Sequence, residues 1–247
     1  VEYGKMLEWC KTLLTCLKHV HRYGFIHCDI KPDNILIMED SQSIVIADMG
    51  LLTISRGKYD RSVGTSSYRA PEVWNKGEKS SSLDIWSLGL TFYYMIQGED
   101  LFHIDASHTT LDKDTKKKLY RQKVDEWSSV YGTGVSLPNF KLHKSHPLYA
   151  TIVSMLNPNP KLRPNAVDIL KNKIFNNVVV PRMSVPELHL LNNIDEDIYV
   201  RWIYEMIKKH VKDDTLASDF SRWFLRKIIT GHHIPIVHPD LEQQYRG

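Results

Sequence analysis

The feature that most constrains this chain is an eight-residue run that places three chemically different polar side chains at fixed offsets. The run reads His27-Cys28-Asp29-Ile30-Lys31-Pro32-Asp33-Asn34. The carboxylate of Asp29 can accept a hydroxyl proton, the ammonium of Lys31 can neutralise phosphate charge, and the carboxamide of Asn34 can bind a divalent cation. Together these groups indicate chemistry that transfers a phosphoryl group to a hydroxyl.

A β-hairpin is predicted directly after this run. Two apolar stretches, residues 35–38 and 44–47, flank the polar turn 39–43, and this pattern is typical of two paired strands. The second strand ends on Asp48-Met49-Gly50, where the carboxylate is another candidate metal ligand. Asn34 and Asp48 are also ordinary capping and turn residues, but their joint spacing favours metal binding.

The order and spacing of these motifs resemble those of the eukaryotic-type serine/threonine protein kinases. The first run matches the catalytic loop H-R-D-L-x-x-x-N, except that Cys28 replaces arginine, and Asp48-Met49-Gly50 matches D-F-G. Ala70-Pro71-Glu72 matches the A-P-E motif that ends the kinase activation segment. Asp84 matches the family residue that binds the catalytic-loop backbone, and Arg163 matches the one that pairs with the glutamate.

The resemblance covers residues 6–175 and implies a role for each matching residue. The implied roles are catalysis by Asp29, Lys31 and Asn34; ATP binding by Lys31, Asn34, Leu36 and Asp48; Mg²⁺ binding by Asn34 and Asp48; substrate docking by Thr65; and structural support by His27, Glu72, Asp84 and Arg163. Leu36 would lie under the adenine. Lys31 and Thr65 match the serine/threonine kinases rather than the tyrosine kinases, which implies a protein substrate with a serine or threonine acceptor.

The implied fold class is mainly α. It is the C-terminal, large lobe of a protein kinase over residues 1–176, with a short β-hairpin at the catalytic loop, followed by a helical C-terminal extension. Residues 4–23 carry apolar side chains at helical spacing, and Gly24 is a typical helix stop. This helix resembles the one that precedes the catalytic loop in kinases.

Kinase motifs that hold ATP are not found in the 247 residues. They are the glycine-rich loop, the strand lysine with its helical glutamate partner, and the adenine-binding hinge. Val1 is not a start methionine. We therefore expect the chain to be a segment of a longer protein, whose N-lobe supplies these parts, and we expect the segment alone to be inactive.

The resemblance also narrows to one group within the kinases. The stretches that are similar to cyclin-dependent kinases are residues 68–73, 84–89, 101–102 and 134–141. The last of these matches an insert between two late helices of that group.

A separate helical region is predicted at the C-terminus. A linker with Pro181 and Pro186 is expected over residues 177–194, and two amphipathic helices follow within 195–247. Their aromatic stripes are usually packing surfaces, so the helices either dock on the lobe or pair with each other. A third interpretation is a regulatory segment, because parts of both helices loosely resemble the opening helices of a cyclin box, although the segment is too short for a whole cyclin fold.

Composition excludes several other classes of protein. Hydrophobic residues make up 42% and charged residues 25%, as expected for one core with an appendage. A net charge of +3 is too small to indicate nucleic-acid binding. Three cysteines without C-x-x-C spacing suit a reducing compartment. Because we find no signal peptide and no long apolar run, we expect an intracellular protein, cytoplasmic or nuclear, without a membrane partner.

Two other classes share part of this pattern. A pseudokinase would keep the lobe as a protein-binding scaffold, but a scaffold does not need intact Asp29, Lys31, Asn34 and Asp48. A small-molecule kinase shares the H-x-D-x-x-x-x-N pattern but is not expected to combine Lys31 with an A-P-E motif.

Cys28 and several hydroxyl groups bear on regulation. The arginine usual at this position binds a phosphate on the activation segment, which cysteine cannot do. We therefore expect activity that depends little on phosphorylation of this segment. Thr53, Ser55, Tyr59 and Ser62 are its candidate phosphorylation sites, although hydroxyl groups in a polar loop are also unremarkable.

Overall fold

The computed structural model describes residues 2–22, 24–37, 44–48, 50–55, 58–59, 63–104 and 111–179. Contacts divide the chain into two compact units, Val1–Val180 and Pro181–Gly247, and all described residues belong to the first. The predicted linker beyond residue 179 and the predicted helices of 195–247, with their cyclin-like pattern, lie outside the described residues and stay predictions.

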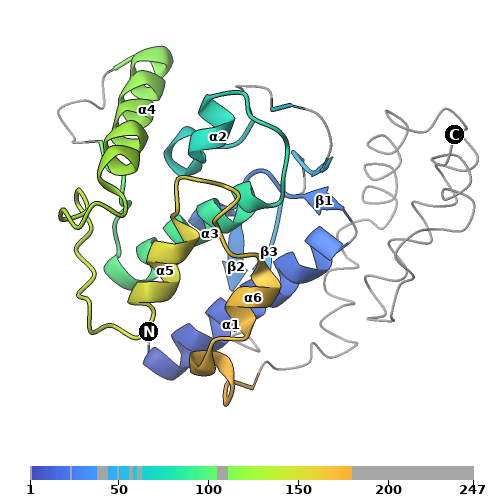
Figure 1. Ribbon diagram of the computed structural model, residues 1–247. Coiled ribbons are helices and arrows are strands. Elements are labelled where there is room, and N and C mark those ends of the chain that lie inside the picture. The colour runs from blue at the N-terminus through green and yellow to red at the C-terminus, as the bar shows by residue number, and fades with distance from the viewer. Residues whose placement is uncertain are drawn as a thin grey trace, which may run out of the picture. The chain divides into compact units, whose positions relative to one another are not determined.

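The described residues of the first unit form mainly helices, with two short β-ladders (Figure 1). The helices are α1 (Tyr3–Arg22), α2 (Pro71–Trp74), α3 (Ser82–Gln97), α4 (Lys113–Val130), α5 (Tyr149–Met155) and α6 (Ala166–Leu170), and single 3₁₀ turns are η1 (Pro32–Asn34), η2 (Ser66–Tyr68) and η4 (Lys173–Phe175). The strands are β1 (Phe25–Ile26), β2 (Ile35–Ile37), β3 (Ile44–Ile46) and β4 (Thr53–Ile54). None of the helices among the described residues is long and apolar enough to span a membrane.

The predicted hairpin is confirmed. Strands β2 and β3 are antiparallel, and Ile35 lies opposite Ile46. A second ladder was not predicted: β1 and β4 pair antiparallel, with Phe25 opposite Ile54 and Ile26 opposite Thr53. It joins the strand that enters the catalytic loop to the beginning of the activation segment, so both are fixed by the same backbone hydrogen bonds.

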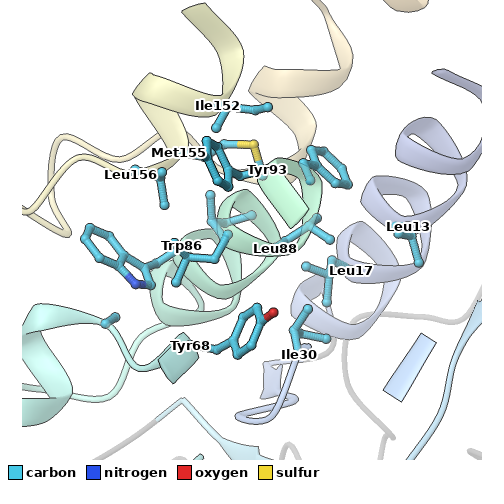
Figure 2. Packing of buried hydrophobic residues seen from close by; sticks show 14 of the residues in the cluster. Leu13, Leu17, Ile30, Tyr68, Trp86, Leu88, Tyr93, Ile152, Met155 and Leu156 are labelled. Atoms are coloured by element: carbon cyan, nitrogen blue, oxygen red, sulfur yellow. The ribbon is translucent and has the colours of Figure 1, made fainter. Parts of the chain in front are cut away.

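Helix α3 forms the centre of the core. All of its residues from Leu83 to Tyr93 are buried, which is expected of a helix that has neighbours on every side. Figure 2 shows its Leu88 beside Leu17 of α1, and Tyr93 beside Met155 of α5. This central position makes α3 a rigid support for the residues at its first turn.

Helix α1 was predicted over residues 4–23 and begins and ends within one residue of that range. Leu13, Leu14 and Leu17 are fully buried on one face. Gly24 has a φ of 75°, and its N–H donates to the carbonyl of His21 at 3.0 Å. The helix therefore stops where the left-handed glycine turns the chain into β1 and the catalytic loop.

Candidate active site

The first turn of α3 anchors the backbone of the catalytic loop. Asp84 has no exposed surface, and its two carboxylate oxygens accept the backbone N–H groups of His27 and Cys28 at 2.8 and 2.9 Å. The Nε2 atom of His21 lies 2.8 Å from the same carboxylate. Cys28 has a φ of 72°, a left-handed conformation that costs a non-glycine residue about 1–2 kcal/mol. The bonds to Asp84 hold the loop in this conformation.

His27 links the catalytic loop to the end of strand β3. Its ring is fully buried. The Nδ1 atom accepts the N–H of Asp29 at 3.3 Å, so Nε2 carries the proton and donates to the carbonyl of Ala47 at 3.2 Å. The N–H of Ala47 in turn donates to the carbonyl of Asn34 at 2.8 Å. Asp48, the next residue, is thereby brought beside the far end of the loop.

Four predicted site residues meet at the Asp29 carboxylate, and we call them the catalytic cluster: Asp29, Lys31, Asn34 and Thr65. The Oδ1 atom of Asp29 accepts both the N–H and the hydroxyl of Thr65, at 2.8 and 2.7 Å. Its Oδ2 atom lies 3.1 Å from Lys31 Nζ and 3.2 Å from Asn34 Nδ2. Lys31 Nζ also donates to the Thr65 hydroxyl at 3.0 Å. One hydroxyl group thus lies between a carboxylate and an ammonium.

The surroundings of Asp29 keep its carboxyl group ionised. Burial by itself raises the pKa of this group, but the hydrogen bonds from Thr65 and Lys31, together with the positive charge of Lys31, outweigh burial and lower the pKa below its usual value of 3.8. The group is therefore a carboxylate at neutral pH, able to accept a hydrogen bond from a hydroxyl.

A glycine allows the activation segment to approach the catalytic loop. Gly64 has a φ of 74°, and a Cβ atom placed on it would lie 2.5 Å from the carbonyl oxygen of Cys28. Arg69 supports the same turn, because its side chain donates to the carbonyls of Val63 and Gly64. The close approach at Gly64 is what brings Thr65, the next residue, within bonding distance of Asp29.

The residues expected to hold Mg²⁺ and ATP have suitable atoms. The amide nitrogen of Asn34 bonds to Asp29, which leaves its amide oxygen as the candidate ligand atom. Asp48 is exposed, with a φ of 56°, and its Oδ1 atom accepts the N–H of Gly50 at 3.1 Å. Carboxylate and amide oxygens suit Mg²⁺, which takes few protein ligands when phosphates supply others. Leu36 is 46% exposed on β2 and offers an apolar surface of the kind that adenine requires.

No group of three or more His, Cys, Asp or Glu side chains able to hold a metal ion occurs among the residues the structure describes. Met49, between Asp48 and Gly50, lies outside the described residues.

Glu72 and Arg163 form a buried, bidentate ion pair. Nη1 lies 2.7 Å from Oε1, and Nη2 lies 3.1 Å from Oε2. Arg163 also donates to the carbonyls of Ser82, at the start of α3, and of Asn157. The pair therefore joins the end of the activation segment to the base of α3, and such a pair fixes geometry more than it adds stability.

Three contacts of the site were not anticipated from the sequence: His21 with Asp84, Gly64 with Cys28, and Tyr59 with Ser80. Tyr59 was considered only as a candidate phosphorylation site, yet it is 3% exposed and its hydroxyl bonds to backbone. Ser55 is exposed, and Ser62 lies outside the described residues. Each missed contact joins residues that the sequence pattern does not relate.

Comparison with known proteins agrees with this geometry. The family model described as "Protein kinase domain" matches residues 2–175, so the chain belongs to the protein kinase family. It is 26% identical over 181 residues to the human hormonally up-regulated neu tumor-associated kinase, an alignment that covers 71% of this chain and 23% of that protein.

Two fungal relatives are more similar over a shorter stretch. The serine/threonine-protein kinase pakA of Talaromyces marneffei is 40% identical over 99 residues, which cover 39% of this chain and 15% of pakA. The serine/threonine-protein kinase ste20 of Aspergillus fumigatus has the same identity over the same length, which is 12% of ste20. The chain spans less than a quarter of the length of these curated relatives.

Proposed function

We propose that this chain is the catalytic lobe of a serine/threonine protein kinase, which transfers the γ-phosphate of ATP to a serine or threonine hydroxyl of a protein. One observation carries the proposal: the Thr65 hydroxyl donates to the Asp29 carboxylate at 2.7 Å and accepts from Lys31 at 3.0 Å. A substrate hydroxyl needs the same two partners, a proton acceptor on one side and a positive charge on the other. Two relatives bear the words serine/threonine-protein kinase in their names.

In the proposed mechanism, Asp29 orients the acceptor hydroxyl and takes its proton late, as the oxygen bonds to phosphorus. The low pKa of Asp29 makes it a weak base, so its main contribution is orientation. Lys31 stabilises negative charge on the transferred group, and Thr65 helps to place the substrate chain. ATP would supply the phosphoryl group, and the bond from its γ-phosphorus to the bridging oxygen would break so that ADP leaves. Asn34 and Asp48 would hold Mg²⁺, which would screen the charge of the phosphates.

We further propose that an N-lobe in the same parent chain completes the ATP site. In support, Leu36 and Ile37 on the β2 strand are 46% and 49% exposed, so both leave apolar surface that a further part of the protein could cover. The grouping with cyclin-dependent kinases, a cyclin-like regulatory segment and an intracellular location stay predictions. The relatives reported above do not support the cyclin-dependent grouping.

The test is an Asp29→Asn variant of the full-length protein, assayed for phosphate transfer to serine- and threonine-containing peptides. We expect kcat to fall by about 10²–10⁴-fold, the usual contribution of a positioned proton acceptor, with an unchanged fold by circular dichroism. Asp125→Asn is the matched control, since Asp125 is exposed on α4 and pairs with Arg121, which is also exposed, away from the catalytic cluster. Equal activity of the wild type and Asp29→Asn would sink the assignment.

The scaffold alternative predicts a different result from the same experiment. A pseudokinase would transfer no phosphate in the wild type, while peptide or protein binding would be unchanged by Asp29→Asn. Because a scaffold gains nothing from a hydroxyl held between a carboxylate and an ammonium, we favour the enzyme.

A further inference from the structure

The middle of the activation segment is held by a buried tyrosine. Tyr59 is 3% exposed and belongs to the hydrophobic core. Its hydroxyl donates to the carbonyl of Ser80 and accepts the N–H of the same residue, both at 2.7 Å. The backbone N–H of Tyr59 donates to the carbonyl of Gly77 at 3.0 Å. One residue thus makes three bonds to the loop between α2 and α3.

Neighbouring contacts join the same two segments. Lys58 forms an isolated antiparallel bridge with Glu78, and Lys79 Nζ lies 3.5 Å from the Thr53 hydroxyl. On the other side, the N–H of Ser55 donates to the carbonyl of Gly24 at 2.8 Å. Residues 53–55 and 58–59 are therefore attached both to the strand that enters the catalytic loop and to the loop that leads into α3.

The loop that receives Tyr59 also positions the catalytic loop. Ser80 lies four residues before Asp84, which binds the backbone of His27 and Cys28. Burial of the Tyr59 ring at this point therefore connects the activation segment to the support that fixes Asp29.

Cys28 cannot bind a phosphate on the activation segment, so a phosphate could not order this segment through residue 28. Its side chain is 3% exposed, and burial raises the pKa of the thiol above its usual range, so it stays neutral. Its sulfur lies 3.7 Å from the carbonyl oxygen of Ile26. A neutral thiol cannot pair with a phosphate dianion in the way a guanidinium does.

We propose that Tyr59 is a positioning residue that orders the activation segment in place of a phosphate, so that Thr65 reaches Asp29 without prior phosphorylation. This inference rests on the proposed function. The Tyr59 hydroxyl can replace a phosphate as an anchor because it binds both the N–H and the carbonyl of Ser80. The tyrosine ring adds buried apolar contact, which a phosphate cannot supply.

The experiment compares the wild type, Tyr59→Phe and Tyr131→Phe in the full-length protein after treatment with phosphatase. Tyr131 is the matched control, because its hydroxyl also donates to a backbone carbonyl, that of Val153 at 3.0 Å, away from the catalytic loop. Two kinds of measurement are made: hydrogen exchange of the peptides that cover Tyr59 and Ser80, and the kinetics of peptide phosphorylation, which give kcat and KM.

We expect Tyr59→Phe to speed exchange at both peptides by about tenfold or more and to lower kcat by about tenfold, because loss of a local anchor frees the segment and misplaces Thr65. The KM for ATP should not change. Tyr131→Phe should alter neither quantity, and the treated wild type should keep its activity.

Unchanged exchange in Tyr59→Phe would overturn the inference, and so would loss of wild-type activity on phosphatase treatment. The exchange measurement also separates this inference from the proposed function. If the wild type transfers no phosphate at all, the proposed function fails, while the exchange of Tyr59→Phe still shows whether the tyrosine orders the segment.

Discussion

Two buried aspartates fix the catalytic loop: Asp29 belongs to the loop, and Asp84 binds it from α3. They differ in whether their partners are backbone groups or side chains. Asp84 bonds to two backbone N–H groups and one histidine ring, and none of its surface is exposed. Asp29 bonds largely to side chains, those of Lys31, Asn34 and Thr65, and is slightly exposed. Backbone partners cannot be exchanged for a substrate, whereas side-chain partners can swing away. The difference separates a residue that holds geometry from one that is available for chemistry.

The same contrast separates two groups of residues. Glu72, Asp84 and Arg163, which we call the frame, differ from the catalytic cluster in the partners they bind. Its members bond mainly to one another or to backbone groups from distant parts of the chain, including Ser82 and Asn157. The catalytic cluster instead gathers ionisable side chains and hydroxyls around one carboxylate. We expect changes in the frame to cost stability, and changes in the cluster to cost activity.

The largest effect on stability should come from Arg163→Met. Removal of the guanidinium leaves Glu72 buried without its partner, which typically costs about 3–5 kcal/mol of unfolding free energy. The measurement is chemical unfolding of the full-length protein followed by near-UV circular dichroism. Lys171→Met is the control, because the Lys171–Asp168 pair has 70% and 50% exposed side chains and should contribute less than about 1 kcal/mol. Equal losses in the two variants would contradict the proposed frame.

A second prediction compares the two aspartates directly. In Asp84→Asn, an amide NH₂ group replaces one acceptor and faces a backbone N–H of His27 or Cys28. An unsatisfied buried donor costs about 1–3 kcal/mol, and the left-handed Cys28 loses part of what holds it. We expect lower stability together with a fall in kcat of about 10–100-fold, as a misplaced Asp29 implies.

Asp29→Asn should instead lower activity with little loss of stability, so the two variants differ in a plot of kcat against unfolding free energy. If Asp84→Asn lost activity without losing stability, Asp84 would belong with the cluster and the distinction would fail.

Local patterns gave part of this architecture. The hairpin of β2 and β3 followed from two apolar runs about a polar turn, and α1 followed from helical spacing that ends at Gly24. The β1–β4 ladder did not follow, because each strand has two residues and the paired residues lie 27 and 29 positions apart in the chain. Strands this short carry no periodic signal.

Part of the candidate site could be predicted from the sequence because its residues lie close together in the chain. Asp29, Lys31 and Asn34 lie within six residues, so their spacing alone limits their geometry. Asp84 and Arg163 could be named only through resemblance to a family, since their partners lie 57 and 91 residues away. Tyr59 had no signal of either kind, because whether an activation-segment tyrosine is exposed or buried depends on tertiary packing.

The smallest predicted effect concerns pH and tests whether Asp29 is held as a carboxylate by its partners. Its pKa in the folded state lies below the usual 3.8 because bonds from Thr65 and Lys31 outweigh burial. The ionised group therefore adds stability above pH 3.8, and this contribution is lost as pH falls through the lower, folded-state pKa. Asp29→Asn lacks the contribution at every pH.

The check is the difference in unfolding free energy between the wild type and Asp29→Asn, followed from neutral to acidic pH. We expect it to shrink on acidification, by less than the loss caused by Arg163→Met. Lys31→Met should reduce this dependence, because the positive charge of Lys31 is one cause of the lowered pKa. A difference that grew as the pH fell would mean that burial dominates, and Asp29 would then resemble a structural residue more than a proton acceptor.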